Sequence, residues 1–240
     1  MDLQALVDDA PKLHDHEGQL VLWGLPRPVL EFIAAQVSEK SRTLETGAGL
    51  STLLFALKGA RHTCVTPSQQ EVDRINAYGE RRGISLERVD FRVGLSTDIL
   101  PKIGPREVDL ALIDGGHGFP TVFMDWYYVA SWLRVGGTLI IDDLQIWTGH
   151  ILKEFLLAER EWKLTELFAN KTAIFLKEKE CCPWNDFGGQ PYVLKQSALL
   201  NVSEPKFRKG MRLLKQGRFL TLAKKLAMRD HKDSSPAKWS

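Results

Sequence analysis

Residues 43–52 read TLETGAGLST, and here a strand-like run meets two glycines and then a helix-like run. Glycine lacks a Cβ, so the backbone at Gly47 and Gly49 can adopt positive φ and let a ligand approach the main chain closely. Ser51 or Thr52 can cap the following helix, whose free N–H groups point back toward that ligand. The stretch therefore predicts a ligand-binding loop between a strand and a helix.

Two kinds of cofactor loop compete for this pattern, the dinucleotide loop and the glycine loop of an S-adenosylmethionine (SAM) site. A dinucleotide loop carries a third glycine, G-x-G-x-x-G, where this chain has Thr52. A P-loop would need G-x-x-x-x-G-K-[ST], and the sequence has no such run. Glu45 stands two residues before the first glycine, which suits the cationic amino-acid end of SAM better than a pyrophosphate. The remaining alternative is a plain glycine-rich turn.

Length and composition indicate one α/β domain of roughly 175 to 180 residues with additions at both ends. The chain has 240 residues, of which 44% are apolar and 26% charged, as is ordinary for a soluble protein. Its three cysteines fit neither a disulfide framework nor a zinc-ligand spacing, which favours a reducing cytoplasm. No basic region precedes an apolar run at the N-terminus, and no apolar stretch is long enough to span a membrane. We therefore expect a cytoplasmic protein.

Strand-like and helix-like runs alternate along the chain. After the glycine loop, we expect strands at residues 62–66, 89–93, 108–113, 138–141, 162–168 and 172–177, with helices between them that include about 119–134 and 147–160. Only a short turn, 169–171, separates the last two strands, which predicts an antiparallel hairpin. This order predicts a doubly wound, mostly parallel α/β sheet with a C-terminal antiparallel hairpin.

Acidic residues follow two of these strands. Asp114 ends the strand at 108–113, and Asp142 and Asp143 end the strand at 138–141. If the two strands are neighbours, their ends lie about 5 Å apart, and such close carboxylates stay ionised only beside a positive charge. Mg²⁺ would supply that charge and lower the pKa of a bound hydroxyl. His117, three residues from Asp114, has an intrinsic pKa suited to accepting the proton. The alternative is that the acids form a helix cap and a turn, with His117 at the surface or in packing.

A cluster of two histidines and two acids, His14-Asp15-His16-Glu17, stands near the N-terminus. Consecutive residues rarely point at one centre, so a solvated loop or a lid over the pocket is favoured over a metal site. We therefore assign residues 1–24 as an N-terminal lid or arm.

The charges are distributed unevenly. Residues 206–229 hold nine Lys or Arg and no Asp or Glu, interspersed with apolar side chains. This pattern predicts a basic amphipathic helix that lies on an anionic membrane surface or meets a partner protein, with a solvated terminal helix as the alternative. We assign residues 179–240 as a C-terminal extension whose end, from Asp233, is disordered.

Several of these stretches together resemble a class I SAM-dependent methyltransferase. They are residues 43–52, 114–117, Asp125, 133–137 and the strand that ends in Asp142 and Asp143. Within that class the chain is similar to the branch called methyltransferase family 24, which is related to catechol-type and sugar O-methyltransferases. The likeness covers roughly residues 20–178, so we assign residues 25–178 as the SAM-dependent methyltransferase domain.

The resemblance implies a seven-stranded Rossmann-like fold with SAM at Glu45, Gly47 and Gly49. In the catechol-type and sugar enzymes it further implies a divalent metal at positions matching Asp114, Asp142 and Asp143. The full set of residues that we expect at the cofactor is Glu45, Thr46, Gly47, Gly49, Ser51, Thr66, Ser68, Ser96 and Asp114.

The chain also departs from the family pattern. Most such enzymes carry an acid after the second strand, where it binds the ribose hydroxyls, but here Thr66, Pro67 and Ser68 occupy that place. An acid is also common after the third strand, where this chain has Ser96 within Gly-Leu-Ser. Gly116 replaces a second acid of related sugar enzymes, which leaves His117 as the better candidate for the base.

These observations predict a SAM-dependent methyltransferase, with metal-assisted O-methylation of a hydroxylated small molecule or saccharide by His117 and Asp114. The alternatives are a metal-independent methyltransferase, a binding protein that kept the fold and lost catalysis, and a nicotinamide oxidoreductase. The expected cofactors are SAM and Mg²⁺. We expect no nucleic-acid partner, and the sequence leaves open a homodimer and peripheral membrane contact through residues 206–229.

Overall fold

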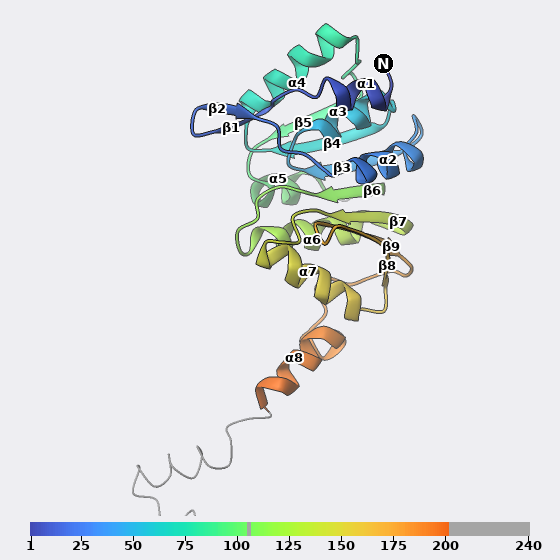
Figure 1. Cartoon of the computed structure of the whole chain (residues 1–240). Coiled ribbons are helices and arrows are strands. Elements are labelled where there is room, and N and C mark those ends of the chain that lie inside the picture. The colour runs from blue at the N-terminus through green and yellow to red at the C-terminus, as the bar shows by residue number, and fades with distance from the viewer. Residues whose placement is uncertain (105–106, 202–240) are drawn as a thin grey trace, which may run out of the picture. The chain divides into compact units, whose positions relative to one another are not determined.

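Seven strands form a single sheet in the order β5-β4-β3-β6-β7-β9-β8 (Figure 1). The structure is a computed structural model that describes residues 1–104 and 107–201. The strands are β3 (Arg42–Thr46), β4 (Arg61–Thr66), β5 (Val89–Val93), β6 (Val108–Ile113), β7 (Leu133–Ile141), β8 (Trp162–Phe168) and β9 (Thr172–Lys177). Strands β3 to β7 pair in parallel, whereas β9 is antiparallel to both β7 and β8. The predicted Rossmann-like sheet with its C-terminal hairpin is confirmed.

Helices cover both faces of the sheet. One apolar cluster packs α1 (Leu3–Asp8), α2 (Arg27–Gln36), α3 (Leu50–Leu57) and α4 (Gln69–Arg82) against the strands. The other packs α5 (Ser96–Ile103), α6 (Thr121–Trp132) and α7 (Trp147–Ala158) against the opposite face. This is the arrangement expected when parallel strands are joined by right-handed crossovers on either side of β3.

The helix predicted over about 119–134 is shorter in the structure, and the strand after it is longer. Leu133 is already extended, with φ −68° and ψ 123°, and pairs with Val108. The register shifts between Val108 and Leu110, so β7 absorbs Gly136 and Gly137 before the regular ladder begins at Thr138. Residues that a sequence pattern assigns to a loop therefore extend the strand.

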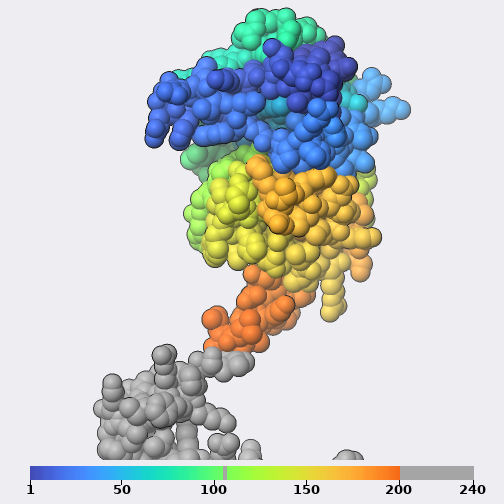
Figure 2. All heavy atoms as spheres, in the orientation of Figure 1, coloured from blue at the N-terminus to red at the C-terminus, as the bar shows by residue number. Residues whose placement is uncertain are grey.

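The N-terminal residues form α1 and a small hairpin of β1 (His14–His16) and β2 (Gln19–Val21). They pack on α4 through several long-range contacts. Arg74 Nη1 donates to the Leu13 carbonyl at 2.8 Å, the Tyr78 hydroxyl donates to the Asp9 carbonyl at 3.0 Å, and Arg82 Nε donates to Asp9 Oδ2 at 2.7 Å. Figure 2 shows these residues, in blue, adjoining the blue-green helix α4. These contacts hold the N-terminal residues against α4.

Helix α4 is capped at both ends. The Ser68 hydroxyl accepts a hydrogen bond from the Glu71 N–H at 3.2 Å, and Gly83 ends the helix with φ +65°. A full capping box would also turn the Glu71 carboxylate back to the Ser68 N–H. Instead, that carboxylate contacts the side chains of Thr66 and His14.

Lys177, at the end of β9, is completely buried. Its Nζ donates to the carbonyls of Ala130 and Leu133 at 3.0 and 2.6 Å and lies 3.1 Å from Glu180 Oε2. The lysine thus satisfies backbone carbonyls at the end of α6, which would otherwise be buried without partners.

We expect Lys177→Met to lower the free energy of unfolding by about 2–4 kcal/mol, because it leaves those carbonyls without a donor. Chemical denaturation followed by circular dichroism measures the loss. Lys163→Met on β8 is the matched control, since its side chain is 62% exposed and should change stability by less than about 0.5 kcal/mol. Equal losses for the two variants would contradict the assigned role.

Beyond the sheet, the described chain contains a 3₁₀ helix at Phe187–Gly189 and α8 at Pro191–Asn201. The basic helix predicted over 206–229 lies outside the described residues. Within residues 1–104 and 107–201, no helix combines the length and apolar character needed to cross a bilayer.

Candidate active site

A cavity of about 770 Å³ opens at the carboxyl ends of the central strands. The chain that follows β3, β4, β6 and β7 lines it with residues 47–51, 66–67, 114–117 and 142–143. The N-terminal arm adds His14 and residues 22–25, and Lys171 comes from the turn between β8 and β9. Ligands of doubly wound sheets bind at this edge, where strand order reverses.

The glycine loop is held by close backbone contacts. Gly47 has φ +93°, and a Cβ at this position would lie 2.3 Å from the Asp114 carbonyl oxygen. Gly47 N–H donates to the Val65 carbonyl, and Asp114 N–H donates to the Thr46 carbonyl. Gly49 is extended, with φ −178°, and has only ordinary contact with His14. The backbone conformation and the close contact both require glycine at position 47, whereas the φ angle at position 49 would allow other residues.

Glu45, at the end of β3, is buried. It is 1% exposed and lies beneath the loop rather than in the cavity lining. Its carboxylate accepts from Ser51 Oγ at 2.7 Å, from Thr52 Oγ1, and from His62 Nε2 at 3.0 Å. The carboxylate thus holds the loop from inside the protein, and a contact of Glu45 with SAM stays a prediction. His62 also lies 2.8 Å from Thr43 Oγ1 through its Nδ1.

Three other predicted cofactor residues lie outside the cavity lining. The hydroxyls of Thr46 and Ser96 lie beside the buried carboxyl of Asp125, whose pKa is raised by burial although both hydroxyls lower it. Ser68 caps α4. None of the three lines the cavity, whereas Gly47, Gly49, Ser51, Thr66 and Asp114 do.

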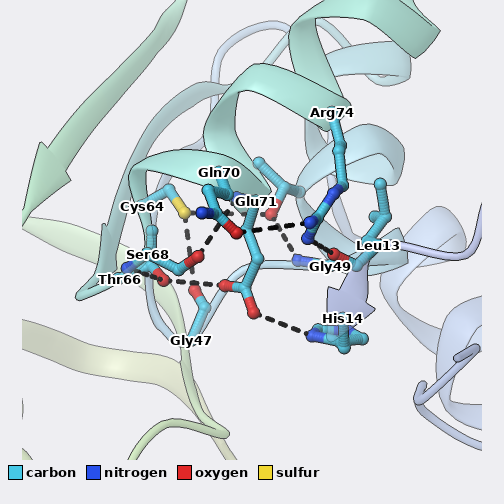
Figure 3. Close-up of polar contacts among 11 residues, drawn as sticks. Leu13, His14, Gly47, Gly49, Cys64, Thr66, Ser68, Gln70, Glu71 and Arg74 are labelled. Carbon is cyan, nitrogen blue, oxygen red and sulfur yellow. Dashed lines mark hydrogen bonds and ion pairs between the residues drawn. The ribbon is translucent and has the colours of Figure 1, made fainter. Parts of the chain in front are cut away.

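Glu71 supplies an acid at the cavity that the sequence reasoning missed. Its Oε2 accepts from Thr66 Oγ1 at 2.9 Å, and its Oε1 lies 3.1 Å from His14 Nδ1. Figure 3 shows the carboxyl group extending from α4 between Thr66 and His14. The side chain therefore brings a carboxylate to the end of β4, where family members carry the ribose acid. The available signal was an acid in the first turn of the helix that follows the strand.

Asp142 and Asp143 point to different partners. Asp142 is 4% exposed and accepts from Lys171 Nζ and from Thr172 Oγ1. Asp143 Oδ2 lies 3.0 Å from His117 Nε2, and Asp143 Oδ1 accepts from Gln145 at 2.6 Å. The hydrogen bond from His117 holds the pKa of Asp143 well below its ordinary value, although burial opposes this. Asp143 therefore remains ionised at neutral pH.

Asp114 differs from its neighbours in electrostatics. Burial, followed by the nearby charges of Asp142 and Asp143, raises its pKa well above the ordinary value. Lys171 partly offsets this effect. The site therefore places a carboxyl group that resists ionisation, Asp114, close to one that ionises readily, Asp143.

The three predicted metal ligands are not brought together as a set. Among the described residues, the group at this cavity whose ligand atoms lie within 4.8 Å of one another is Asp114, His117 and Asp143. His117 thus replaces Asp142, because Lys171 and Thr172 engage the Asp142 carboxylate. Mg²⁺ prefers oxygen ligands, and both oxygens of Asp143 already have protein donors. As arranged here, these residues do not fit a Mg²⁺ site.

The histidines of the N-terminal cluster do not form a metal site with their neighbours. His14 faces Glu71, while Asp15, His16 and Glu17 are exposed on the small hairpin. Another group within ligand distance, Glu45, His62 and Cys64, is fully buried beneath the glycine loop, and Ser51 and Thr52 already donate to its carboxylate.

Comparison with known proteins identifies the fold. Residues 44–144 match the model of methyltransferase family 24, which is described as a methyltransferase domain. No curated protein matches the sequence.

Three solved structures illustrate the likeness. The SAM complex of the O-methyltransferase TomG from Streptomyces achromogenes has a TM-score of 0.54 and 16% identity, over 65% of this chain and 82% of that one. Cofactor-bound Rv0187 from MTB has a TM-score of 0.56 and 16% identity, over 73% and 88%. An rRNA methylase from Streptococcus thermophilus has a TM-score of 0.50 and 17% identity, over 65% and 100%. At identities this low, the likeness shows the fold alone.

Proposed function

We propose, from the family 24 methyltransferase domain that residues 44–144 carry, that the protein transfers the methyl group of SAM to an oxygen of a hydroxylated small molecule or saccharide. The observation that carries the proposal is the shared cavity. It is lined by both the glycine loop and the pair of His117 Nε2 and Asp143 Oδ2, which lie 3.0 Å apart. A cofactor loop and a proton acceptor thus meet at one edge of the sheet.

The proposed cofactor residues are those whose groups line the cavity. The backbone of residues 47–51 approaches the ligand, and Ser51 lies at the first turn of α3. Glu71 takes the place of the ribose-binding acid, with its carboxylate already oriented by Thr66. This assignment accounts for the absence of an acid directly after β4, because the acid comes from the next helix instead.

His117 is the proposed general base. Its Nε2 faces the ionised Asp143, which favours the proton on that nitrogen and leaves Nδ1 to accept a proton from the acceptor hydroxyl. SAM supplies an electrophilic methyl group, so the acceptor oxygen gains the carbon as the carbon–sulfur bond breaks. The site contributes mainly by holding oxygen and methyl at attacking distance. No step passes through a metal ion, since the acidic residues here do not fit Mg²⁺.

The acceptor is proposed to be small because the same cavity of about 770 Å³ must hold it together with SAM. Half-exposed Leu22 and Trp23, from the N-terminal arm, supply apolar surface on its wall. The partly buried side chains of His117, which follows β6, and Lys171, in the turn between β8 and β9, add polar groups to the lining.

Calorimetric titration of the full chain with SAM tests the cofactor assignment. We expect a Kd in the micromolar range and no heat with NAD. Transfer of a labelled methyl group from SAM to panels of phenols, polyols and saccharides then tests the reaction. The absence of heat at millimolar SAM would support the alternative of a binding protein that retained the fold without catalysis.

Glu71→Gln should weaken SAM binding about tenfold, which corresponds to about 1.4 kcal/mol, because an amide accepts fewer hydrogen bonds from ribose hydroxyls than a carboxylate does. Calorimetry measures the change in Kd. Glu80→Gln, on the exposed face of the same helix, is the matched control and should bind SAM as the unmodified chain does. Unchanged affinity in Glu71→Gln would remove Glu71 from the cofactor site.

A further inference from the structure

A lysine lies among the acidic residues at the ends of β6 and β7. Lys171 Nζ donates to Asp142 Oδ2 and lies 3.3 Å from Asp143 Oδ1. Its side chain is 33% exposed and belongs to the cavity lining. The ammonium group thus contacts two carboxylates that the sequence assigned to a divalent cation.

The position of Lys171 is fixed by its backbone. Its N–H donates to the Phe168 carbonyl at 2.8 Å, and its carbonyl accepts from Leu144 N–H at 2.9 Å. The preceding turn places Ala169 and Asn170 at positive φ, +48° and +54°. The second hydrogen bond ties the hairpin turn to the segment directly after Asp143, so the lysine and the acids are held in one unit.

Each carboxylate oxygen of Asp142 and Asp143 has a partner within the protein. Thr172 and Lys171 engage the two oxygens of Asp142, while His117 and Gln145 engage those of Asp143. An ammonium has three N–H donors, and the two carboxylates account for two of them. With respect to the residues that the structure describes, one donor therefore remains for a group in the cavity.

We propose that Lys171 takes the place of a divalent cation in this site: its ammonium offsets Asp142 and Asp143, and its remaining N–H binds the acceptor oxygen. The second part rests on the proposed function, whereas the first concerns the free protein. A fixed cation near the acceptor oxygen stabilises the negative charge that develops as His117 removes the proton. The geometry therefore assigns metal-independent methyl transfer to this protein.

Metal titration tests the first part without any turnover. The full chain is titrated with MgCl₂ and with MnCl₂ by calorimetry in the absence of SAM. We expect no binding below millimolar concentrations for the unmodified chain, because the ammonium occupies the position between the acids. Lys171→Met removes the charge at similar length and should bind Mn²⁺ at least tenfold more tightly. Submillimolar binding by the unmodified chain, or no gain in folded Lys171→Met, would overturn the proposal.

Turnover tests the second part. With an acceptor identified, the unmodified chain should keep its rate in EDTA, and Lys171→Met should lose about 10²-fold in kcat, with part of the loss restored by Mn²⁺. Lys171→Arg keeps the charge and should remain insensitive to EDTA. Lys153→Met, a lysine on α7 that lies outside the cavity lining, is the control for a general effect of losing a lysine. A rate lost in EDTA and restored by metal in the unmodified chain would contradict this role.

The outcomes separate this inference from the proposed function. If the chain binds no SAM and methylates nothing, the proposed function fails, while the metal titration still decides whether Lys171 occupies the cation position. Thermal melting of each variant verifies that it folds. If Lys171→Met does not fold, Lys171→Arg carries the metal titration, and submillimolar metal binding by that charged variant would overturn the proposal.

Discussion

Replacing Gly47 with alanine is expected to weaken SAM binding strongly, with Kd raised by at least about 10²-fold, equivalent to about 2.7 kcal/mol. The residue has φ +93°, and its added Cβ would lie 2.3 Å from the carbonyl oxygen of Asp114. Because that atom belongs to the backbone at the end of β6, relief requires the loop and the strand end to separate. We also expect a loss of about 2–4 kcal/mol in stability, measured by denaturation alongside calorimetry with SAM.

Gly83→Ala separates the clash from the backbone strain. Gly83 also has positive φ, +65°, but a Cβ there would meet nothing within 4 Å, and the residue ends α4 away from the cavity lining. It should lose about 1 kcal/mol of stability and keep its affinity for SAM. Normal SAM affinity in Gly47→Ala would show that the close approach of the loop to β6 is unimportant for the cofactor.

Replacing His117 with glutamine is expected to lower kcat by about 10²- to 10⁴-fold, the usual contribution of a general base, and to leave the Kd for SAM unchanged. Glutamine keeps a polar side chain beside Asp143 but cannot accept the proton. The measurement is the rate of methyl transfer at saturating SAM and acceptor, together with calorimetry for SAM. A rate within threefold of the unmodified chain would mean that another group, or water, accepts the proton.

His150→Gln is the matched control for this variant, since His150 is an exposed histidine on α7 and should not change kcat. Asp143→Asn extends the test, because it removes the charge that orients His117 without removing the base. We expect a smaller loss of kcat than in His117→Gln, and nonadditive losses when the two changes are combined.

The loop, the sheet and the positions of the strand-end acids follow from local patterns in the sequence. A strand that is buried on both faces requires a run of apolar residues such as 110–113, and the turn after β3 requires a glycine at position 47. These requirements concern residues that are close together along the chain, so they can be predicted from the sequence. The β8–β9 hairpin was predicted for the same reason, since only a short turn separates its strands.

The partner of each charged side chain was decided only by the tertiary structure. Glu45 has the sequence position of a cofactor acid, but His62, on the neighbouring strand β4, lies against it and holds it beneath the loop. Glu71 stands in the first turn of α4, and its contact with His14 of the N-terminal arm holds its carboxylate at the cavity. Lys171 stands 29 residues from Asp142 along the chain and meets it because β9 pairs with β7. A carboxylate's environment depends on charges and donors that folding brings near, and these distances are set by strand order and helix packing rather than by spacing in the sequence.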